Sequence, residues 1–260
     1  KAKTWVLLAD YGDPSRIRNT LAFSIASKLS NLHYTSKIQH VELYVNGVYN
    51  GLYLVAEQIE VKENRVEIDD TIDDDLSFLI ELDFRAPSEG TYDIDYFVVD
   101  DIPYGIKAPD IEENYPSSYT IKIKEFIKYC FEVIQKDNYQ DICDIIDVES
   151  FVDSYILNEL FGNVDVKFSS WYLYKDKHGK LFSGPVWDYD ISAGNCNYDN
   201  LVIKTNFLYA LYYNKWYYYL MEHREFKEKV IMRMAELKDV MLEEIDIEIE
   251  DALIHKSYFL

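Results

Sequence analysis

Residues 157–190 read LNELFGNVDVKFSSWYLYKDKHGKLFSGPVWDYD, and this stretch decides the fold. Its middle part, over 171–182, has the apolar pattern of a short hairpin with a polar turn. One aspartate, Asp165, lies before the hairpin, and another, Asp188, lies after it. Because a hairpin returns the chain to its starting end, its turn can bring the two carboxylates to the same end, although by spacing alone two loop aspartates are more often solvated turn residues or helix caps.

The segment immediately before this stretch has the signals of a helix over 148–161. Its apolar residues recur on one face. Asp147 can cap the first turn with its side chain, and Gly162 is a natural stop. The sequence therefore predicts a helix that ends just before Asp165 and leaves this aspartate in a loop.

The two halves of the chain differ in their periodicity, which predicts an α+β protein. The first half is mainly strands with one early helix, and the second half is mainly helices. We expect one domain with a sheet-rich part over 1–112, a helix-rich part over 113–260 and a ligand-binding cleft between them. The expected strands are a buried strand over Trp5–Ala9, a hairpin of 41–45 and 48–55 around Asn46-Gly47, and strands over 78–84, 94–99 and 104–107; the other expected helices are 16–29, 119–134 and 226–241, with a helical tail.

The charge of the chain excludes two classes of partner. Its 260 residues include 47 acidic and 26 basic side chains, for a formal charge of −21. Such a surface repels nucleic-acid phosphates and anionic lipid, so we expect neither as a partner. No run of apolar residues approaches the ~20 needed to span a membrane.

The three cysteines and the first residues of the chain do not decide its redox compartment. Cys130 and Cys143 lie in segments with helical periodicity, where buried thiols are common, although a bond between them is possible. Cys196 has no CxxC partner, so a zinc knot is not expected. No signal peptide is visible, and the abrupt start reads as a piece of a longer precursor.

Four motifs occur in order over residues 4–195, and together they resemble the CotH family. The tail past residue 200 resembles the family only loosely. The motifs are an aromatic strand with DPSRIRN at 13–19, VELYVNGVYNGLY at 41–53 followed by EQI at 57–59, NELFGNVD at 158–165, and GPVWDYD at 184–190.

The resemblance implies an atypical protein-kinase-like fold and transfer of a phosphoryl group from ATP to Ser or Thr of a protein, with Mg²⁺ or Mn²⁺. It implies that Asp165 is the catalytic aspartate and that Asp188 binds the metal, with help from Asp190 and Asn195. It further implies a secreted or cell-surface protein, associated with a spore coat or a cellulosome-type assembly. In protein kinases one carboxylate orients the attacking hydroxyl and another holds the metal, which is the order found here.

A nucleotide also needs positive groups around its phosphates, and three residues are candidates for this part of the site. Glu57 is expected either to pair with a lysine or contact a metal, or to be a surface residue at the start of a short helix. Arg18 can reach a phosphate, but a structural clamp on Asp13 or Glu57 is the favoured interpretation. Lys107 is a further candidate.

Two departures from the family pattern keep a second interpretation open. The position five residues after Asp165, where kinases have an asparagine that binds metal, is Ser170. The basic segment that the family has before the first strand is absent from this chain. The alternative is a catalytically silent binding or scaffolding module, in which the tyrosine-rich run 209–219 could line a peptide groove or pack in the core. A glycosidase with paired carboxylates ranks third.

Overall fold

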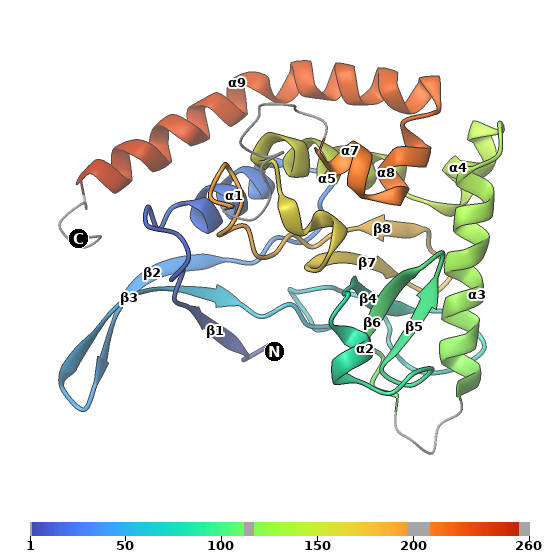
Figure 1. Ribbon diagram of the computed structural model, residues 1–260, viewed down its shortest axis with the longest axis horizontal. Helices are drawn as coiled ribbons and strands as arrows, with labels where there is room; N and C mark the ends of the chain where they lie inside the picture. Colours follow the sequence, from blue (N-terminus) through green and yellow to red (C-terminus); the bar gives the residue numbers. More distant parts are fainter. Residues whose placement is uncertain (1, 112–116, 197–208, 255–260) are drawn as a thin grey trace.

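The structure is a computed structural model, and it describes residues 2–111, 117–196 and 209–254. Strands predominate in the first half, and helices dominate the second half (Figure 1). The strands are β1 Trp5–Leu8, β2 Ile38–Val45, β3 Val48–Glu57, β4 Phe78–Leu82, β5 Tyr96–Val99, β6 Ile102–Ala108, β7 Trp171–Lys175 and β8 Leu181–Ser183. The helices are α1 Arg18–Lys28, α2 Ala86–Glu89, α3 Ser117–Ile134, α4 Tyr139–Ile145, α5 Val148–Phe161, the 3-10 helix η1 Val164–Lys167, α7 Tyr209–Tyr213, α8 Lys215–Leu220 and α9 Arg224–Ile254. The architecture is therefore α+β, as the sequence predicts.

The strands form two antiparallel sheets. One has the order β1-β3-β2, and the other has the order β5-β6-β4-β7-β8. The hairpin of β2 and β3 turns at Asn46 and Gly47, whose φ angles of 52° and 81° lie in the left-handed region that this tight turn requires. The predicted hairpin is confirmed, and its tip extends away from the body (Figure 1).

The five-stranded sheet takes strands from both halves of the chain. Its central strand β4 pairs on one side with β6 and on the other with β7, where Phe78 faces Lys175 and Leu82 faces Trp171. The expected boundary at residues 112 and 113 separates a strand-rich from a helix-rich part of the sequence. One hydrogen-bonded sheet nevertheless contains strands from both parts.

The expectation that β1 is a buried strand is wrong. Trp5 is 53% exposed and Leu7 is 50% exposed, while Val6 and Leu8 are partly buried. Exposed and partly buried residues alternate along β1, so the face of the strand that carries Trp5 and Leu7 points to solvent, as one face of an antiparallel sheet commonly does. An all-apolar run of four residues does not reveal which kind of strand it forms.

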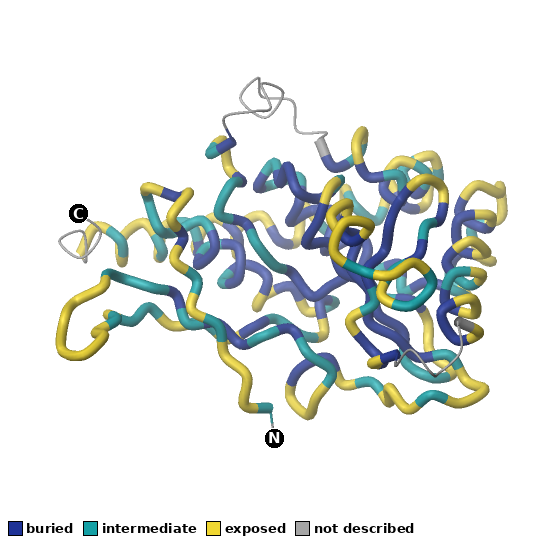
Figure 2. Tube along the Cα trace, turned by 60° about the horizontal axis from the view of Figure 1, so that its bottom comes forward, coloured by how far each residue is buried: buried dark blue, intermediate teal, exposed yellow. Residues whose placement is uncertain are grey.

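The main core lies between the five-stranded sheet and helices α3, α5 and α8 (Figure 2). Trp216 is fully buried at its centre, and its Nε1 donates to the hydroxyl of Tyr104 at 2.9 Å. Its ring lies 4.5 Å from that of Phe131 and 5.7 Å from that of Phe151, measured between centroids. Within the aromatic run, Trp216 and Tyr217 therefore pack in the core.

Helix α5 begins and ends where its sequence predicts. The Asp147 carboxylate accepts a hydrogen bond from Ser150 N at 2.9 Å, which caps the first turn. Gly162 has a left-handed φ of 51°, and its N–H bonds the last carbonyls of the helix. Because both ends of α5 are fixed by local chemistry, the segment that follows it begins at a defined residue, and Asp165 lies there in the 3-10 helix η1 rather than in the expected loop.

Helix α9 confirms the predicted C-terminal helix and its helical continuation. It packs along α1 and α5, held by ion pairs of Arg233 with Asp153 and of Lys28 with Glu244 (Figure 1). Across the described ranges, none of the helices combines the length and apolar character needed to cross a bilayer. All three cysteines are free thiols in the structure.

Candidate functional site

Asp165 lies in η1, directly after the end of α5. Its backbone N–H donates to the side chain of Asn163 at 3.0 Å, which caps the short 3-10 turn. The Asn163 amide donates in turn to Asn158 in the last turns of α5 at 2.9 Å. The NELFGNVD motif therefore builds a rigid turn that holds one buried aspartate.

Asp188 follows β8 and has a left-handed φ of 64°, which is uncommon for a residue other than glycine. Its Oδ2 lies 3.4 Å from the hydroxyl of Ser170, which also has a left-handed φ, of 59°. Unusual backbone at two residues that face one another across the hairpin is typical of functional sites. The side-chain contact places Ser170 beside Asp188.

The charge of Asp188 acts on the carboxyl group of Asp165. Burial and the charges of Asp188 and Asp190 raise the pKa of Asp165 to about 6, while Arg85 opposes the shift. Burial and the charge of Asp190 likewise raise the pKa of Asp188 to about 6, while the Ser170 hydroxyl and Arg85 oppose the shift. The hairpin therefore brings the two aspartates into one field of uncompensated negative charge.

The loop after β1 completes this acidic cluster. Asn19 joins the two parts, because its amide donates to Asp10 at 2.7 Å and its carbonyl accepts from Tyr189 N at 2.6 Å. Burial raises the pKa of Asp10, and the neighbouring charge of Asp190 adds to this. Residues 170 positions apart in the sequence, Asn19 and Tyr189, thus join one site.

Arg18 has the structural role that the sequence favours. Its guanidinium binds the buried Asp13 carboxylate, and its Nε donates to the Ser192 carbonyl at 3.0 Å. Burial acts to raise the pKa of Asp13, but hydrogen bonds from Ser15 and Arg18 outweigh it and lower the pKa. Arg18 therefore ties the loop after β1 to the loop that follows Asp190.

Asn195 also ties these loops together. Its amide nitrogen donates to the Gly12 carbonyl at 2.7 Å and to the Asp190 carbonyl at 2.8 Å. A Cβ added at Gly12 would lie 3.4 Å from Asp190 Oδ2, so the two loops are in close contact. Asn195 therefore lies beside Asp190, with its amide nitrogen committed to the backbone.

Lys107 is connected to the acidic cluster by the buried Glu81, a residue that sequence reasoning missed. Its Nζ lies 2.8 Å from Oε2 of Glu81, in the neighbouring strand β4. Oε1 of Glu81 accepts from Ser170 N at 2.8 Å. A chain of contacts therefore runs from Lys107 through Glu81 and Ser170 to Asp188. An acid inside the apolar strand FLIEL was the signal that could have identified Glu81.

Arg85 is the second residue that sequence reasoning missed, after Glu81. It follows β4, its Nε lies 3.2 Å from Asp83, and its charge lowers the pKa of both Asp165 and Asp188 against the effect of burial. No local pattern distinguishes this arginine from a solvent-exposed turn residue. Only the pairing of β4 with β7 brings it near the acidic cluster.

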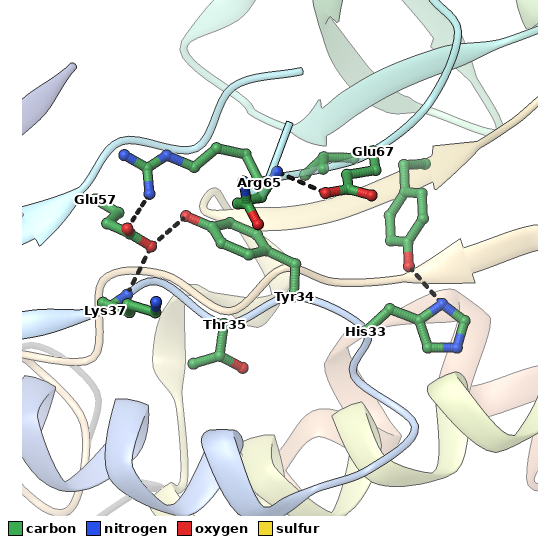
Figure 3. Close-up of a pocket in the computed structure, with 10 residues that line it drawn as sticks. His33, Tyr34, Thr35, Lys37, Glu57, Arg65 and Glu67 are labelled. Atoms are coloured by element: carbon green, nitrogen blue, oxygen red, sulfur yellow. Dashed lines mark hydrogen bonds and ion pairs between the residues drawn. The ribbon is translucent and has the colours of Figure 1, made fainter. Parts of the chain in front are cut away.

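Glu57 lies elsewhere, in a pocket of about 510 Å³ (Figure 3). It ends β3, is buried, and forms an ion pair with the buried Arg65 rather than with a lysine. The alternative of a surface residue that starts a short helix is wrong. Its Oε2 also accepts from Lys37 N at 3.1 Å. The described residues that line this pocket do not include Asp165 or Asp188.

The carboxylates of the cluster fit a hard cation that takes its remaining oxygen ligands from the phosphates of a substrate. In the described part of the chain, no three His, Cys, Asp or Glu side chains are close enough to form a complete metal site. Mg²⁺ is commonly held by one or two carboxylates together with substrate phosphates. Asp188, with Asp190 beside it, fits this mode, and the raised pKa of Asp188 shows that its negative charge lacks compensation.

A stability measurement tests this uncompensated charge. The raised pKa values of Asp165 and Asp188 give a contribution to stability that is fully present below about pH 4 and is lost as the pH rises through about 6. Without divalent ions, Asp165→Asn and Asp188→Asn should therefore each stabilise the protein at pH 7.5, by roughly 1–2 kcal/mol, but not at pH 4. Thermal melts at both pH values measure this.

The matched control for these melts is Asp69→Asn. Lys177 holds the pKa of Asp69 at about 2, so this substitution should destabilise at pH 7.5, with the opposite sign. Mg²⁺ should reduce the advantage of the Asp188 variant by stabilising the wild type. Equal melting temperatures for wild type and both site variants at pH 7.5 would show that the carboxyl groups are fully compensated.

A helix, a loop aspartate, a hairpin and a second loop aspartate occur in the order found in protein kinases. The fold and site together thus define an α+β protein with a kinase-like order of elements.

A family model described as CotH kinase protein matches residues 1–255, so the chain belongs to the CotH family. It is 25% identical over 197 residues to inner spore coat protein H of Bacillus subtilis (strain 168), over 72% of this chain and 49% of that protein. The chain thus spans about half the length of this curated relative.

Proposed function

We propose that this domain transfers the γ-phosphoryl group of Mg·ATP to a Ser or Thr hydroxyl of a protein. The observation that carries the proposal is the position of two aspartates on the segments that flank one hairpin, the buried Asp165 and the partly buried Asp188, where burial and the charge of Asp188 raise the pKa of Asp165. Family membership supports it, because the family description contains the word kinase. Such a site needs mainly positioning and charge stabilisation, which fixed carboxylates and cations supply.

Asp165 is proposed to orient the acceptor hydroxyl and to take its proton. The hydroxyl oxygen forms a bond to the γ-phosphorus while the bond from phosphorus to the β,γ-bridging oxygen breaks, and ADP leaves with that electron pair. A pKa of about 6 leaves Asp165 ionised at neutral pH but basic enough to accept the proton. The rigid turn from Asn158 to Asp165 would hold the carboxylate in place.

Asp188 is proposed to hold the metal, with Asp190 and Asn195 supporting its loop. When bound, Mg²⁺ would neutralise charge on the phosphate oxygens. Lys107 is proposed as a phosphate-binding cation, because Glu81 fixes its ammonium group on the strand next to the cluster. Arg18 and Glu57 are engaged by Asp13 and Arg65, so we assign them to the framework that shapes the site.

Ser170 favours the second candidate function, a silent binding module. Its hydroxyl faces Asp188 from the position where kinases have a metal-binding asparagine. A hydroxyl is a weaker ligand for a hard cation than a carboxamide oxygen. In that case the family fold would serve as a scaffold in an assembly.

Thermal melts with nucleotide separate the two candidates. We expect ATP with Mg²⁺ to raise the melting temperature. At a hundredfold excess of ATP over its Kd, the expected gain in the free energy of unfolding is about 3 kcal/mol. ATP with EDTA should give a much smaller shift. Incubation with γ-labelled ATP and a Ser-containing protein should then yield labelled protein. A scaffold without nucleotide binding would show neither the shift nor the label.

The named relative supports a location for the domain. Because that protein is called an inner spore coat protein, we propose that this chain also works in a surface or spore-coat assembly. Its acidic charge of −21 suits contact with basic protein partners. Fractionation of cells and spores with an antibody against the domain would test this location.

A further inference from the structure

Two phenylalanine side chains form an exposed, stacked pair beside the acidic cluster. Phe84 follows β4 and Phe168 follows η1, and their ring centroids lie 5.9 Å apart with an angle of 11° between the planes. The N–H of Phe84 donates to the carbonyl of Phe168 at 2.9 Å, so the two turns are joined. The side chains are 42% and 46% exposed. The pair therefore presents a fixed aromatic surface to solvent.

Both phenylalanines are next to residues of the proposed catalytic site. The N–H of Phe168 donates to the carbonyl of Asp165 at 2.7 Å, which places it about 6 Å further along the 3-10 turn. Phe84 directly precedes Arg85, whose charge acts on Asp165 and Asp188. The aromatic surface is therefore at the rim of the acidic cluster.

We infer that Phe84 and Phe168 form a subsite for a large apolar side chain of the protein substrate, within about three residues of the hydroxyl that accepts the phosphoryl group. An extended peptide advances about 3.3 Å per residue, so a neighbouring side chain spans this distance. The inference rests on the proposed function, since it places the acceptor hydroxyl at Asp165.

The surroundings favour a peptide segment over a second copy of this chain. Two copies that each carry a charge of −21 repel one another, whereas a peptide brings no such charge. Lys167, the neighbour of Phe168, lies with its Nζ 4.3 Å from the ring centroid of Tyr213, so aromatic surface continues along η1 toward α7. A strip of this kind suits an extended chain that crosses the site.

The experiment uses pairs of peptides that contain one acceptor Ser. The two peptides of a pair differ at one position, which is Leu in one peptide and Ala in the other. That position is varied from three residues before the acceptor to three residues after it. At one position the wild type should prefer Leu by about five- to tenfold in kcat/KM, because the apolar side chain is buried against both rings. Phe168→Ala and Phe84→Ala should bring the Leu/Ala ratio close to one, mainly through KM. Phe168→Leu, which keeps an apolar surface, should retain most of the preference.

A matched control is Tyr44→Ala, which removes one ring of another exposed aromatic pair. Tyr44 and Tyr49 have centroids 5.4 Å apart and lie in the β2–β3 hairpin, which projects from the body (Figure 1). This variant should keep the wild-type preference. The inference is wrong if the wild type phosphorylates both peptides equally at every position, or if both Phe variants keep its preference.

A binding measurement keeps this inference separate from the proposed function. Fluorescence anisotropy of the labelled Leu peptide should show at least about fivefold weaker binding to Phe168→Ala than to wild type, whether or not phosphate is transferred. If transfer is absent but this difference remains, the kinase proposal fails and the subsite stands. Equal binding by both proteins overturns the subsite, as does a wild-type dimer that Phe168→Ala converts to a monomer in sedimentation.

Discussion

Replacing Asp188 with alanine is expected to lower phosphoryl transfer from Mg·ATP by at least about a thousandfold. The reason is that Asp188 is the proposed metal ligand, a partly buried carboxylate whose pKa is raised by burial and by the charge of Asp190, and the loop that carries it is fixed by Arg18 and Asn195. The same variant should lose most of the Mg²⁺-dependent thermal stabilisation by ATP. Transfer of label to a Ser peptide and thermal melts measure the two effects.

The matched variant is Asp165→Asn, which separates metal binding from proton transfer. It should lose transfer by about 10²–10⁴-fold, because the amide cannot accept the hydroxyl proton. Unlike Asp188→Ala, it should keep the Mg²⁺-dependent stabilisation by ATP. If both variants transferred phosphate at the wild-type rate, the assignment of this site would be wrong. If they lost stabilisation to the same extent, the division of roles between the two aspartates would be wrong.

Replacing Trp216 with alanine should cause the largest loss of stability that a single substitution in α8 can cause, about 4 kcal/mol. The indole is fully buried between rings from β6, β7, α3 and α5, and its N–H has a partner in Tyr104. Removing it leaves a cavity and an unpaired hydroxyl. The melting temperature should fall by about 10 °C in a domain of this size.

Two further variants of α8 calibrate that result. Trp216→Phe keeps much of the volume and loses the hydrogen bond, so it should cost roughly 1–2 kcal/mol. Tyr218→Ala, on the exposed face of the same short helix, should cost little. A loss for Trp216→Ala no larger than that for Tyr218→Ala would mean that the aromatic cluster does not join the sheet to the helices.

The parts of the fold that local chemistry determines could be predicted from the sequence. Asp147 and Gly162 fix both ends of α5 through contacts within a few residues, and Asn46-Gly47 fixes the β2–β3 turn in the same way. The approach of Asp165 to Asp188 also follows from a local hairpin. Each of these depends only on residues close together in the chain.

The parts that depend on distant contacts could not be predicted. Glu57 pairs with Arg65 across a loop, and its environment is set by residues that no spacing rule connects to it. Glu81 and Arg85 reach the site only because β4 pairs with β7, far along the sequence. Lys107 could be named as a candidate, but its partner Glu81 could not. The exposure of β1 likewise depends on what covers its outer face.

The central position of β4 has a consequence for how the protein is made. Its partner on one side, β6, follows soon after it in the sequence. Its partner on the other side, β7, is synthesised much later, since Phe78 pairs with Lys175. At a synthesis rate of about 5–20 residues per second, the nascent chain carries this open strand edge for some seconds to tens of seconds. An unpaired apolar edge is a template for contact with other chains. Ribosome-bound chains that end between β6 and β7 should therefore be the species most in need of chaperones.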